Sequence, residues 1–449
     1  MAHCNSTRTR RILRTLLSPR DLLSAAWNTG FRSRARKLDL TAFVSTLVFG
    51  TAAVARRSVQ ALWTAYLMAA NRPMAKSAFY RWVSKPRLVP WLEMLLASVL
   101  DKMKRTVPRR LAGALGQFRD LFVPDSSVLH LPAYLAALYP GTGKGRSAAA
   151  LKLHVVQEMS GGGIRTFKTT DGKASDSKHF HVGPWAEGAL LLMDLGYYCF
   201  RRFARIHDLG GFFISRVKDK ANPWIVRSLR THRGQQVPVA GERLQDILGR
   251  LRRHILDCEV EVEYQARAYR GTRRGHRLAL RLVGIWDQAD RAYHLYFTNI
   301  PPEKLRAEQI ADAYRLRWQV ELFFRELKGI HKLEDLPGQK PHVIRAMILA
   351  SLLAAVVTRR LVAALRARLG LDEADLPHEQ GGLLMHVVAM PLLLLAAGVR
   401  RHLNALERLL EHRLALAART LRTKRPNLQR QLQNLTGDHA VHRLIWCGV

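Results

Sequence analysis

The chain has 449 residues, of which 48% are hydrophobic and 24% are charged, so it carries enough apolar side chains to fold and is not disordered throughout. Its 72 Lys and Arg residues outnumber 35 Asp and Glu residues, which gives a formal net charge of +37. A charge this far from zero repels itself unless a polyanion offsets it. The composition therefore favours a nucleic-acid-binding protein with room for about three domains of ~150 residues.

The apolar segments and the cysteines favour a cytoplasmic protein. Segment 346–357 is shorter than the ~20 residues that a membrane-spanning helix needs, and segment 383–399 is interrupted by His386 and Pro391. Both are predicted to be buried helices, no secretory signal is expected at the basic N-terminus, and membrane-surface binding remains a remote alternative. The four cysteines are spaced too widely for a zinc knuckle or a disulfide framework: Cys4, Cys199, Cys258 and Cys447.

Residues 1–115 are predicted to be helical, because apolar residues recur at helical spacing and nothing alternates like a strand. Within this region, 57–70 and 76–83 can form two short helices joined through 71–73, and the second helix carries basic and aromatic residues. This pair is compatible with a DNA-binding helix-turn-helix. An ordinary helical hairpin with solvated basic residues remains the alternative.

Residues 116–219 are predicted to be a mixed α/β region, since short apolar segments alternate with turn residues. The glycine-rich loop 141–147 lacks the Lys-Ser or Lys-Thr pair of a phosphate-binding Walker motif. One helix is expected at 197–208. The expected strands are an extended stretch made of 121–125 and 127–131, followed by 151–157, 164–170, 190–193 and 211–217.

Residues 220–300 are predicted to be rich in β-structure, with strands at 257–265, 278–286 and 292–299. Carboxylates alternate with apolar residues along the first of these strands, so they share one face. They are Asp257, Glu259, Glu261 and Glu263. A metal site there is conceivable, but a solvated face or pairing with neighbouring Arg residues is favoured, because no His or second ligand strand accompanies them.

Segment 314–328 is predicted to lie on one α-helix that begins near Glu303. Its apolar residues recur at i, i+4, i+7 and i+11 and form a core-facing stripe of Leu316, Val320, Phe323 and Leu327. Within about a 60° arc on the opposite side, at ~100° per residue, lie Tyr314, Arg317, Glu321 and Lys328. Such residues can be ordinary surface ion pairs, or they can form a functional face.

Two aspartates supply further acidic groups. Asp125 follows a short apolar segment, and Asp194 ends the apolar strand 190–193. Carboxylates at strand ends are placed to share a ligand, although turn capping explains either residue alone. Asp120 competes with Asp125 if the strand end shifts, and weaker candidates without a diagnostic spacing are His154, His179, His181 and Asp176.

Three motifs in order along the chain resemble the DDE transposases of the insertion-sequence-four type. They are Asp125-Ser126-Ser127, Asp194-Leu195-Gly196-Tyr197 and Tyr314-x2-Arg317-x3-Glu321-x6-Lys328, the last of which matches the YREK signature at every spacing. The resemblance covers residues 120–335 and implies an α/β fold, in which an RNase H-like catalytic domain carries a β-rich insertion and is flanked by helical regions. The implied division is a basic DNA-end-binding region 1–115, a first catalytic part 116–219, an insertion 220–300, a catalytic helix segment 301–340, and a helical C-terminal region 341–449 with a basic tail.

The resemblance also implies the chemistry of the site. Asp125, Asp194 and Glu321 are the implied catalytic residues and ligands of two Mg²⁺ ions, for which Mn²⁺ can substitute, with Asp125 bridging the pair. Hard carboxylate oxygens without His or Cys are the ligands that Mg²⁺ prefers. Two such ions can stabilise the attacking and leaving oxygens of a phosphodiester displacement.

Other residues near Glu321 are implied to bind DNA. Arg317 and Lys328 would hold phosphates beside the metal ions, and the Tyr314 hydroxyl would add a phosphate contact. Trp318 would stack on a base or sugar, or else be a partly buried core aromatic.

The resemblance finally implies function and partners. The protein is expected to be an insertion-sequence transposase that cuts double-stranded DNA at its terminal inverted repeats and transfers the 3′-OH to target DNA, with a hairpin intermediate as an option. A homodimer on DNA in the bacterial cytoplasm, at the nucleoid, is expected. The alternatives are a metal-dependent nuclease of the same fold without strand transfer, and a DNA-binding descendant without catalysis. Retention of all three carboxylates argues against the latter.

Overall fold

The structure, a computed structural model, describes residues 7–32, 38–50, 58–70, 73–106, 111, 113–143, 148–160, 163–232, 235–251, 254–265, 275–333, 336, 340–370, 376 and 378–398. The C-terminal residues 399–449, with the expected basic tail, lie outside this part of the chain. So do Cys4, Cys447, the helix link at 71–72 and residues 144–147 of the glycine-rich loop.

The N-terminal region is helical, as expected for the flank of the catalytic domain. Ser18, Asp39 and Ser58 each cap a helix by accepting a hydrogen bond from a backbone N–H of its first turn. The elements are α1 (Thr7–Leu16), α2 (Pro19–Asn28), α3 (Leu40–Ser45), the π-helical turn η1 (Thr46–Gly50), α5 (Val59–Ala69), α6 (Lys76–Val83) and α7 (Leu88–Thr106).

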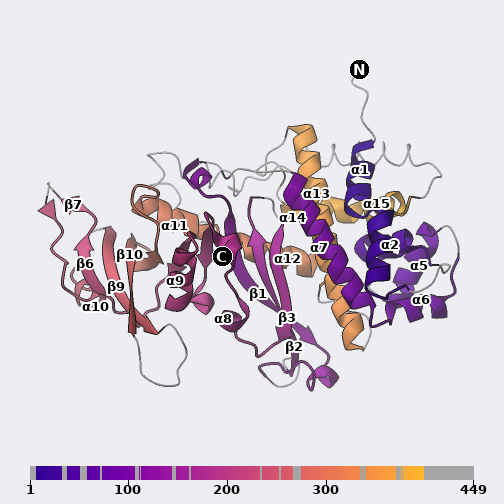
Figure 1. Cartoon of the computed structure of the whole chain (residues 1–449), viewed down its shortest axis with the longest axis horizontal. Helices are drawn as coiled ribbons and strands as arrows, with labels where there is room; N and C mark the ends of the chain where they lie inside the picture. Colours follow the sequence, from indigo (N-terminus) through magenta and orange to yellow (C-terminus); the bar gives the residue numbers. More distant parts are fainter. Residues whose placement is uncertain are drawn as a thin grey trace.

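Among the described residues, a nine-stranded sheet extends from one end of the elongated molecule to its middle, and the helical bundle lies at the other end (Figure 1). Its strand order is β3-β2-β1-β4-β5-β11-β10-β9-β6. The strands are β1 (Leu121–Leu131), β2 (Ala149–Glu158), β3 (Ile164–Asp171), β4 (Leu190–Met193), β5 (Phe212–Arg216), β6 (Trp224–Ser228), β9 (Ile255–Gln265), β10 (Gly275–Asp287) and β11 (Ala292–Thr298). A separate two-stranded ribbon joins β7 (Thr231–His232) to β8 (Gln235–Gln236).

The first five strands form the RNase H-like core. β1 is antiparallel to β2 and parallel to β4, β2 is antiparallel to β3, and β4 is parallel to β5. Every residue of β4 is buried, as is typical of a central parallel strand that is covered on both faces. The expected α/β fold with helical flanks is therefore confirmed.

The strands of 220–300 continue the same sheet. β11 pairs antiparallel with β5, and β10, β9 and β6 follow in antiparallel order. The carboxylates of β9 meet arginines: Arg227 Nε lies 2.7 Å from Glu259, and Arg277 lies 3.2 Å from Glu261. The expected pairing of this acidic face with Arg residues is confirmed.

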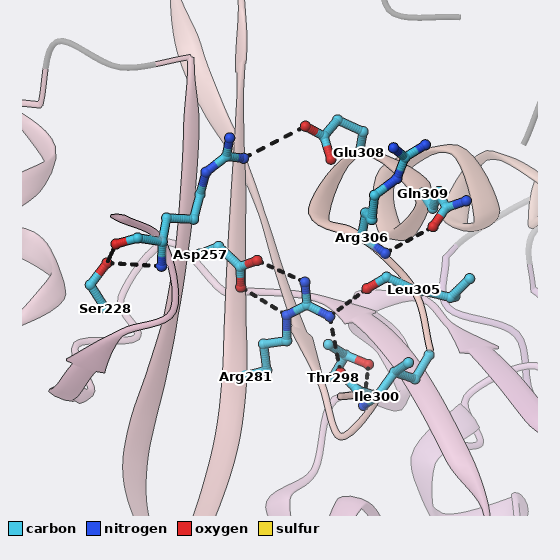
Figure 2. Close-up of polar contacts among 10 residues, drawn as sticks. Ser228, Asp257, Arg281, Thr298, Ile300, Leu305, Arg306, Glu308 and Gln309 are labelled. Atoms are coloured by element: carbon cyan, nitrogen blue, oxygen red, sulfur yellow. Dashed lines mark hydrogen bonds and ion pairs between the residues drawn. The ribbon is translucent and has the colours of Figure 1, made fainter. Parts of the chain in front are cut away.

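A buried ion pair between β9 and β10 also binds the loop that leads from β11 to α11 (Figure 2). The Arg281 guanidinium donates to both carboxylate oxygens of Asp257, at 2.8 and 2.7 Å. It also donates to the carbonyl oxygens of Ile300 (3.1 Å) and Leu305 (2.7 Å), so the loop before α11 (Ala307–Arg315) is held against β10.

Helices cover both faces of the sheet. α11 and α12 (Trp318–Gly329) share one core with α13 (Pro341–Leu369) and the N-terminal helices. α9 (Phe200–Asp208) and α10 (Leu244–Leu248) contribute to the core on the other face. The predicted stripe of Leu316, Val320, Phe323 and Leu327 is buried, so this part of the sequence interpretation is confirmed.

The expected single helix through 314–328 is wrong in one respect. α11 ends at Arg315 and α12 begins at Trp318, with Leu316 and Arg317 in a turn between them. The N–H groups of Leu316, Arg317, Gln319 and Val320 donate to the carbonyls three residues earlier, which tightens the backbone there. This break changes the direction in which Tyr314 projects relative to Glu321.

The C-terminal helices pack on the N-terminal bundle. α13 contacts α7, and α15 (Ala389–Ala397) contacts α3, while α14 (His378–Val387) contacts α12 and α13. By length and composition α13 could cross a membrane, with a mean hydropathy of 1.9, but 89% of its apolar window is buried inside the molecule. α14 and α15 together pass the same test but are bent by 69°. The apolar segment 346–357 is thus part of a longer helix than expected, and it is a core helix.

Candidate active site

The register of two neighbouring parallel strands places Asp125 and Asp194 side by side. Leu121 and Phe122 of β1 pair with Leu190 and Leu191 of β4, and each aspartate follows at the same number of residues beyond this pair. Because side chains alternate along a strand, both project toward the face that α12 covers. β4 ends at Met193, so Asp194 lies at a strand end as expected, whereas Asp125 lies within the longer β1.

The turn-capping alternative does not account for Asp194. Although Asp194 occupies the N-cap position of the short helical turn η6 (Leu195–Tyr197), its side chain makes no capping hydrogen bond. Asp120, the competitor of Asp125, precedes β1, and its Oδ1 accepts hydrogen bonds from the N–H groups of Leu121 (2.7 Å) and Ser160 (3.4 Å). Asp120 therefore has a local structural role.

Glu321 approaches this pair from α12, which packs against β1. Burial raises the pKa of Asp125 to about 6, and the charges of Asp194 and Glu321 act in the same direction. The Ser126 N–H, which donates to Asp125 Oδ1 at 2.8 Å, and the Arg317 guanidinium oppose this rise. Asp125 and Asp194 are level on neighbouring strands, and Glu321 lies on the helix that packs against β1. The three expected carboxylates therefore lie on the same side of the RNase H-like core.

Arg317 is the cation beside these carboxylates. Its Nη2 donates to Glu321 Oε1 at 2.6 Å. Burial tends to lower the pKa of the guanidinium, but the bond to Glu321 and the charge of Asp194 outweigh it, so the net shift of the Arg317 pKa is upward. Arg317 thus remains a fixed positive charge next to the acidic group.

Tyr314 is buried rather than exposed on a common face with Glu321. Its ring packs 5.1 Å from that of Tyr296, and its hydroxyl is buried with no hydrogen-bond partner among the described residues. Burial raises the pKa of this hydroxyl, and Asp194 acts in the same direction. The phenol therefore stays protonated and retains a proton to donate.

The two remaining expected DNA contacts differ in their surroundings. Lys328 Nζ donates to the carbonyl oxygen of Val128 at 3.2 Å, which ties the end of α12 to β1. Trp318 is 51% exposed beside Arg317, so the core-aromatic alternative does not apply to it. Contacts of either residue with DNA remain predictions.

The donor set suits a divalent metal. The three carboxylates offer hard oxygen ligands, their mutual repulsion favours a cation, and the unpartnered Tyr314 hydroxyl lies near Asp194. A different group, Asp287, Asp290 and His294, has ligand atoms all within 4.8 Å of one another at the β10–β11 turn. There Asp287 Oδ1 accepts from the N–H groups of Ala289 (2.8 Å) and Asp290 (3.2 Å), which is turn chemistry.

Asp176, a weaker candidate without a diagnostic spacing in the sequence, makes a specific contact with β1. The Ser126 hydroxyl donates to Asp176 Oδ1 at 2.6 Å across 50 residues of sequence. A motif pattern could not reveal this contact because Asp176 belongs to the four-residue helix α8 (Asp176–His179), which has no periodic signal of its own. The contact places a fourth carboxylate next to the Asp125 segment.

An RNase H-like sheet with acidic side chains from β1, the end of β4 and a following helix defines a nucleic-acid-processing class of protein. The family described as Transposase DDE domain matches residues 116–357, and the chain belongs to this family. The resemblance seen in the sequence motifs is thereby confirmed.

Similar proteins support this assignment. The chain is 21% identical over 373 residues to the transposase for insertion sequence element IS231B of Bacillus thuringiensis subsp. berliner, covering 75% of this chain and 76% of that protein. It is 25% identical over 269 residues to the transposase for IS231F of Bacillus thuringiensis subsp. israelensis, covering 54% and 56%. A piggyBac transposase synaptic complex with hairpin DNA aligns at 10% identity over 96% of this chain and 86% of that chain, with a TM-score of 0.41, which supports no assignment of residues.

Proposed function

We propose that this insertion-sequence transposase cuts DNA at the terminal inverted repeats of its own element and joins the freed 3′-OH to target DNA. The observation that carries the proposal is that Asp125, Asp194 and Glu321 lie on the same side of the sheet and that Arg317 is bonded to Glu321. Family membership establishes the transposase class. The two-metal cleavage, the strand transfer and an optional hairpin on the flanking DNA are parts of the proposal.

The carboxylates would hold two Mg²⁺ ions, or Mn²⁺ in their place, with Asp125 shared between them. Bound there, the ions supply stabilisation of the attacking and leaving oxygens of an in-line phosphodiester displacement. Asp125 has to lose its proton to serve as a ligand, and its raised pKa of about 6 still leaves it ionised at neutral pH.

The neighbouring residues orient the DNA. Arg317 would exchange part of its bond with Glu321 for a bidentate contact to a phosphate, which its planar guanidinium favours. The buried Tyr314 hydroxyl would have to be uncovered before it could donate to a phosphate oxygen, whereas the exposed Trp318 ring offers a stacking surface. Lys328 would need to leave the Val128 carbonyl to reach a phosphate.

The partners follow from the reaction. One chain carries one set of the three carboxylates, so processing two element ends together calls for a homodimer on DNA. The net charge of +37 suits extended contact with DNA. We place the reaction in the bacterial cytoplasm, at the nucleoid.

The test is metal-dependent cleavage and joining of a duplex built from the sequences that flank the gene. Wild type is compared with Asp194→Ala and Glu321→Gln, and with Glu259→Gln as a control that alters a carboxylate paired with Arg227. We expect both site variants to lose cutting and joining while binding the ends, and the control to retain both activities. Arg317→Ala should weaken binding and cutting together, since it removes a phosphate contact.

Three outcomes would contradict parts of the proposal. Cutting by Glu321→Gln at the wild-type rate would remove Glu321 from the metal site. Cutting by wild type without joining, or without a need for paired ends, would indicate a nuclease of the same fold. Binding of paired ends without any cutting in the presence of metal would indicate a DNA-binding protein without catalysis.

A further inference from the structure

The strand that carries Asp125 presents a second polar group on its other face. Asp125 and Ser126 are neighbours on β1 and therefore project to opposite sides of the sheet. Ser126 pairs in register with His154 of β2, away from the face that α12 covers. On this side the Ser126 hydroxyl donates to Asp176 Oδ1 at 2.6 Å.

The carboxylate of Asp176 is itself fixed by β2. Lys152 Nζ lies 3.4 Å and His154 Nδ1 lies 3.5 Å from Asp176 Oδ1. The His154 side chain is only 8% exposed, and its Nε2 lies 2.9 Å from Thr170 Oγ1 on β3. The side chains of two adjacent strands thus define the place of Asp176.

The helix that carries Asp176 contacts η6, the turn that follows Asp194. A Cβ added at Gly196 of this turn would lie 3.9 Å from Asp176 Oδ2, so the carboxylate faces the turn. Arg202 of α9 reinforces the contact, because it donates to the carbonyl oxygen of Ser177, at 2.5 Å, and to that of Tyr197. Arg202 therefore connects helix α8 to the segment that follows β4.

We propose that Asp176 is a positioning residue that holds Asp125 and Asp194 in place relative to each other, a role that rests on the proposed metal-dependent function. Ser126 links the two carboxylates, since its N–H binds Asp125 Oδ1 at 2.8 Å while its hydroxyl binds Asp176. The other oxygen of Asp176 faces Gly196 in the turn beyond Asp194, which α8 contacts. We do not assign Asp176 as a metal ligand. Its Oδ1 already accepts from Ser126 and lies near Lys152, on the face of β1 opposite to Glu321.

The role of Asp176 predicts an effect on metal affinity that is separate from folding. Residues that orient ligands typically change metal affinity or activity by about 10–100-fold when they are removed. Asp176→Ala removes the carboxylate and therefore the bond from Ser126 and the charge beside Lys152. Asp176→Asn keeps an oxygen that can accept from Ser126. Ser126→Ala removes only the hydroxyl link and keeps the N–H bond to Asp125.

The experiment titrates full-length protein with Mn²⁺ and detects free Mn²⁺ by electron paramagnetic resonance, with DNA-end binding and thermal unfolding measured alongside. The matched control is Asp171→Asn, which changes the acidic residue at the end of β3, whose Oδ1 accepts from the Lys173 N–H at 3.0 Å. We expect Asp176→Ala to weaken Mn²⁺ binding at least about tenfold and Asp176→Asn and Ser126→Ala to weaken it less. End binding should stay within twofold of wild type, and Asp171→Asn should match wild type.

The outcomes separate this proposal from the one on which it rests. Wild-type protein that binds Mn²⁺ and cuts DNA, together with Asp176→Ala that does both equally well, overturns the positioning role alone. An equal loss in Asp171→Asn, or a loss in Asp176→Ala that comes with unfolding while Asp176→Asn and Ser126→Ala match wild type, overturns it as well. Failure of wild-type protein to bind Mn²⁺ or cut DNA overturns the proposed function, and the positioning role with it.

Discussion

The central sheet has an RNase H-like half, β1–β5, and an inserted half, which consists of β6 and β9–β11. The two halves differ in what surrounds their buried carboxylates. In the inserted half, Asp257 is buried and neutralised by a bidentate bond from Arg281. In the RNase H-like half, burial raises the pKa of Asp125, and the other two carboxylates of the site reinforce the rise. A paired buried carboxylate holds strands together, whereas one set among like charges favours a bound proton or cation. The two halves thus differ in what balances a buried carboxylate: an arginine of the same chain in one, and a proton or, on the proposed function, a metal ion in the other.

The largest expected effect is on cleavage, in the RNase H-like half. Asp125→Asn should lower the rate of metal-dependent DNA cutting by at least about a thousandfold, because an amide is a poor replacement for a shared carboxylate ligand. Asp257→Asn, in soluble folded protein, should cut at close to the wild-type rate. Single-turnover cleavage of end duplexes measures both variants, and equal losses would remove the distinction between the two halves.

The next effect is on stability, in the inserted half. Arg281→Met should lower the free energy of unfolding by about 3–5 kcal/mol, because it leaves Asp257 as an unpaired buried charge. The loop carbonyls of Ile300 and Leu305 lose their donor as well. Urea unfolding followed by circular dichroism measures the loss. Replacing both partners, in Asp257→Leu with Arg281→Met, should recover much of it, and a double variant as unstable as the single one would contradict this account.

A smaller stability effect of the opposite sign is expected at Asp125. Its folded pKa of about 6 lies above the ordinary value of 3.8, so the folded state binds a proton more tightly than the unfolded state does. Its contribution to stability is present below about pH 4 and is lost as the pH rises through 6. In the presence of EDTA, Asp125→Asn should therefore be more stable than wild type at pH 8 by about 1–3 kcal/mol. The two proteins should unfold at similar urea concentrations near pH 4, and a difference that does not depend on pH would point to packing instead.

The smallest effect is expected at the exposed pairs of the inserted strands. Glu259 and Arg227 lie at the surface with 30% and 59% of their side chains exposed, and such pairs contribute ~0–1 kcal/mol. Glu259→Ala should change the free energy of unfolding by less than about 1 kcal/mol, with less effect still at high salt. A larger loss in the same urea titration would show that exposure is a poor guide to the role of carboxylates in this half.

The sequence was sufficient for the fold class and for the family. Apolar segments with turn residues between them predicted most strands closely, except β6, β7 and β8, because strand formation is read from local alternation and β-branched residues. The order of the three motifs supplied the acidic residues. The register that brings Asp125 level with Asp194 could be stated only once β1 and β4 were seen to pair in parallel.

Other features were out of reach because they depend on contacts between distant segments. The helix breaks at Leu316 and Arg317 although the helical spacing of apolar residues continues through them, so the local sequence does not predict the break. Glu326 is buried and bonded to Arg359 of α13 at 2.7 Å, a contact between distant segments that no local pattern contains. Burial raises its pKa, but Arg359 and His331 outweigh this and lower it overall. Asp176 likewise acquires its role from β1, β2 and Gly196.

The site carboxylates lie far apart along the chain. This spacing determines when the site is complete in a newly synthesised protein. β1, the end of β4 and α12 have long stretches of chain between them, and contacts between such distant segments form late because loop closure has to come first. Synthesis delivers the N-terminal parts first, so a nascent chain acquires both aspartates well before Glu321. A fragment that stops ahead of α12 has two of the three acidic groups, and on the proposed function it cannot cut the DNA from which it is being expressed.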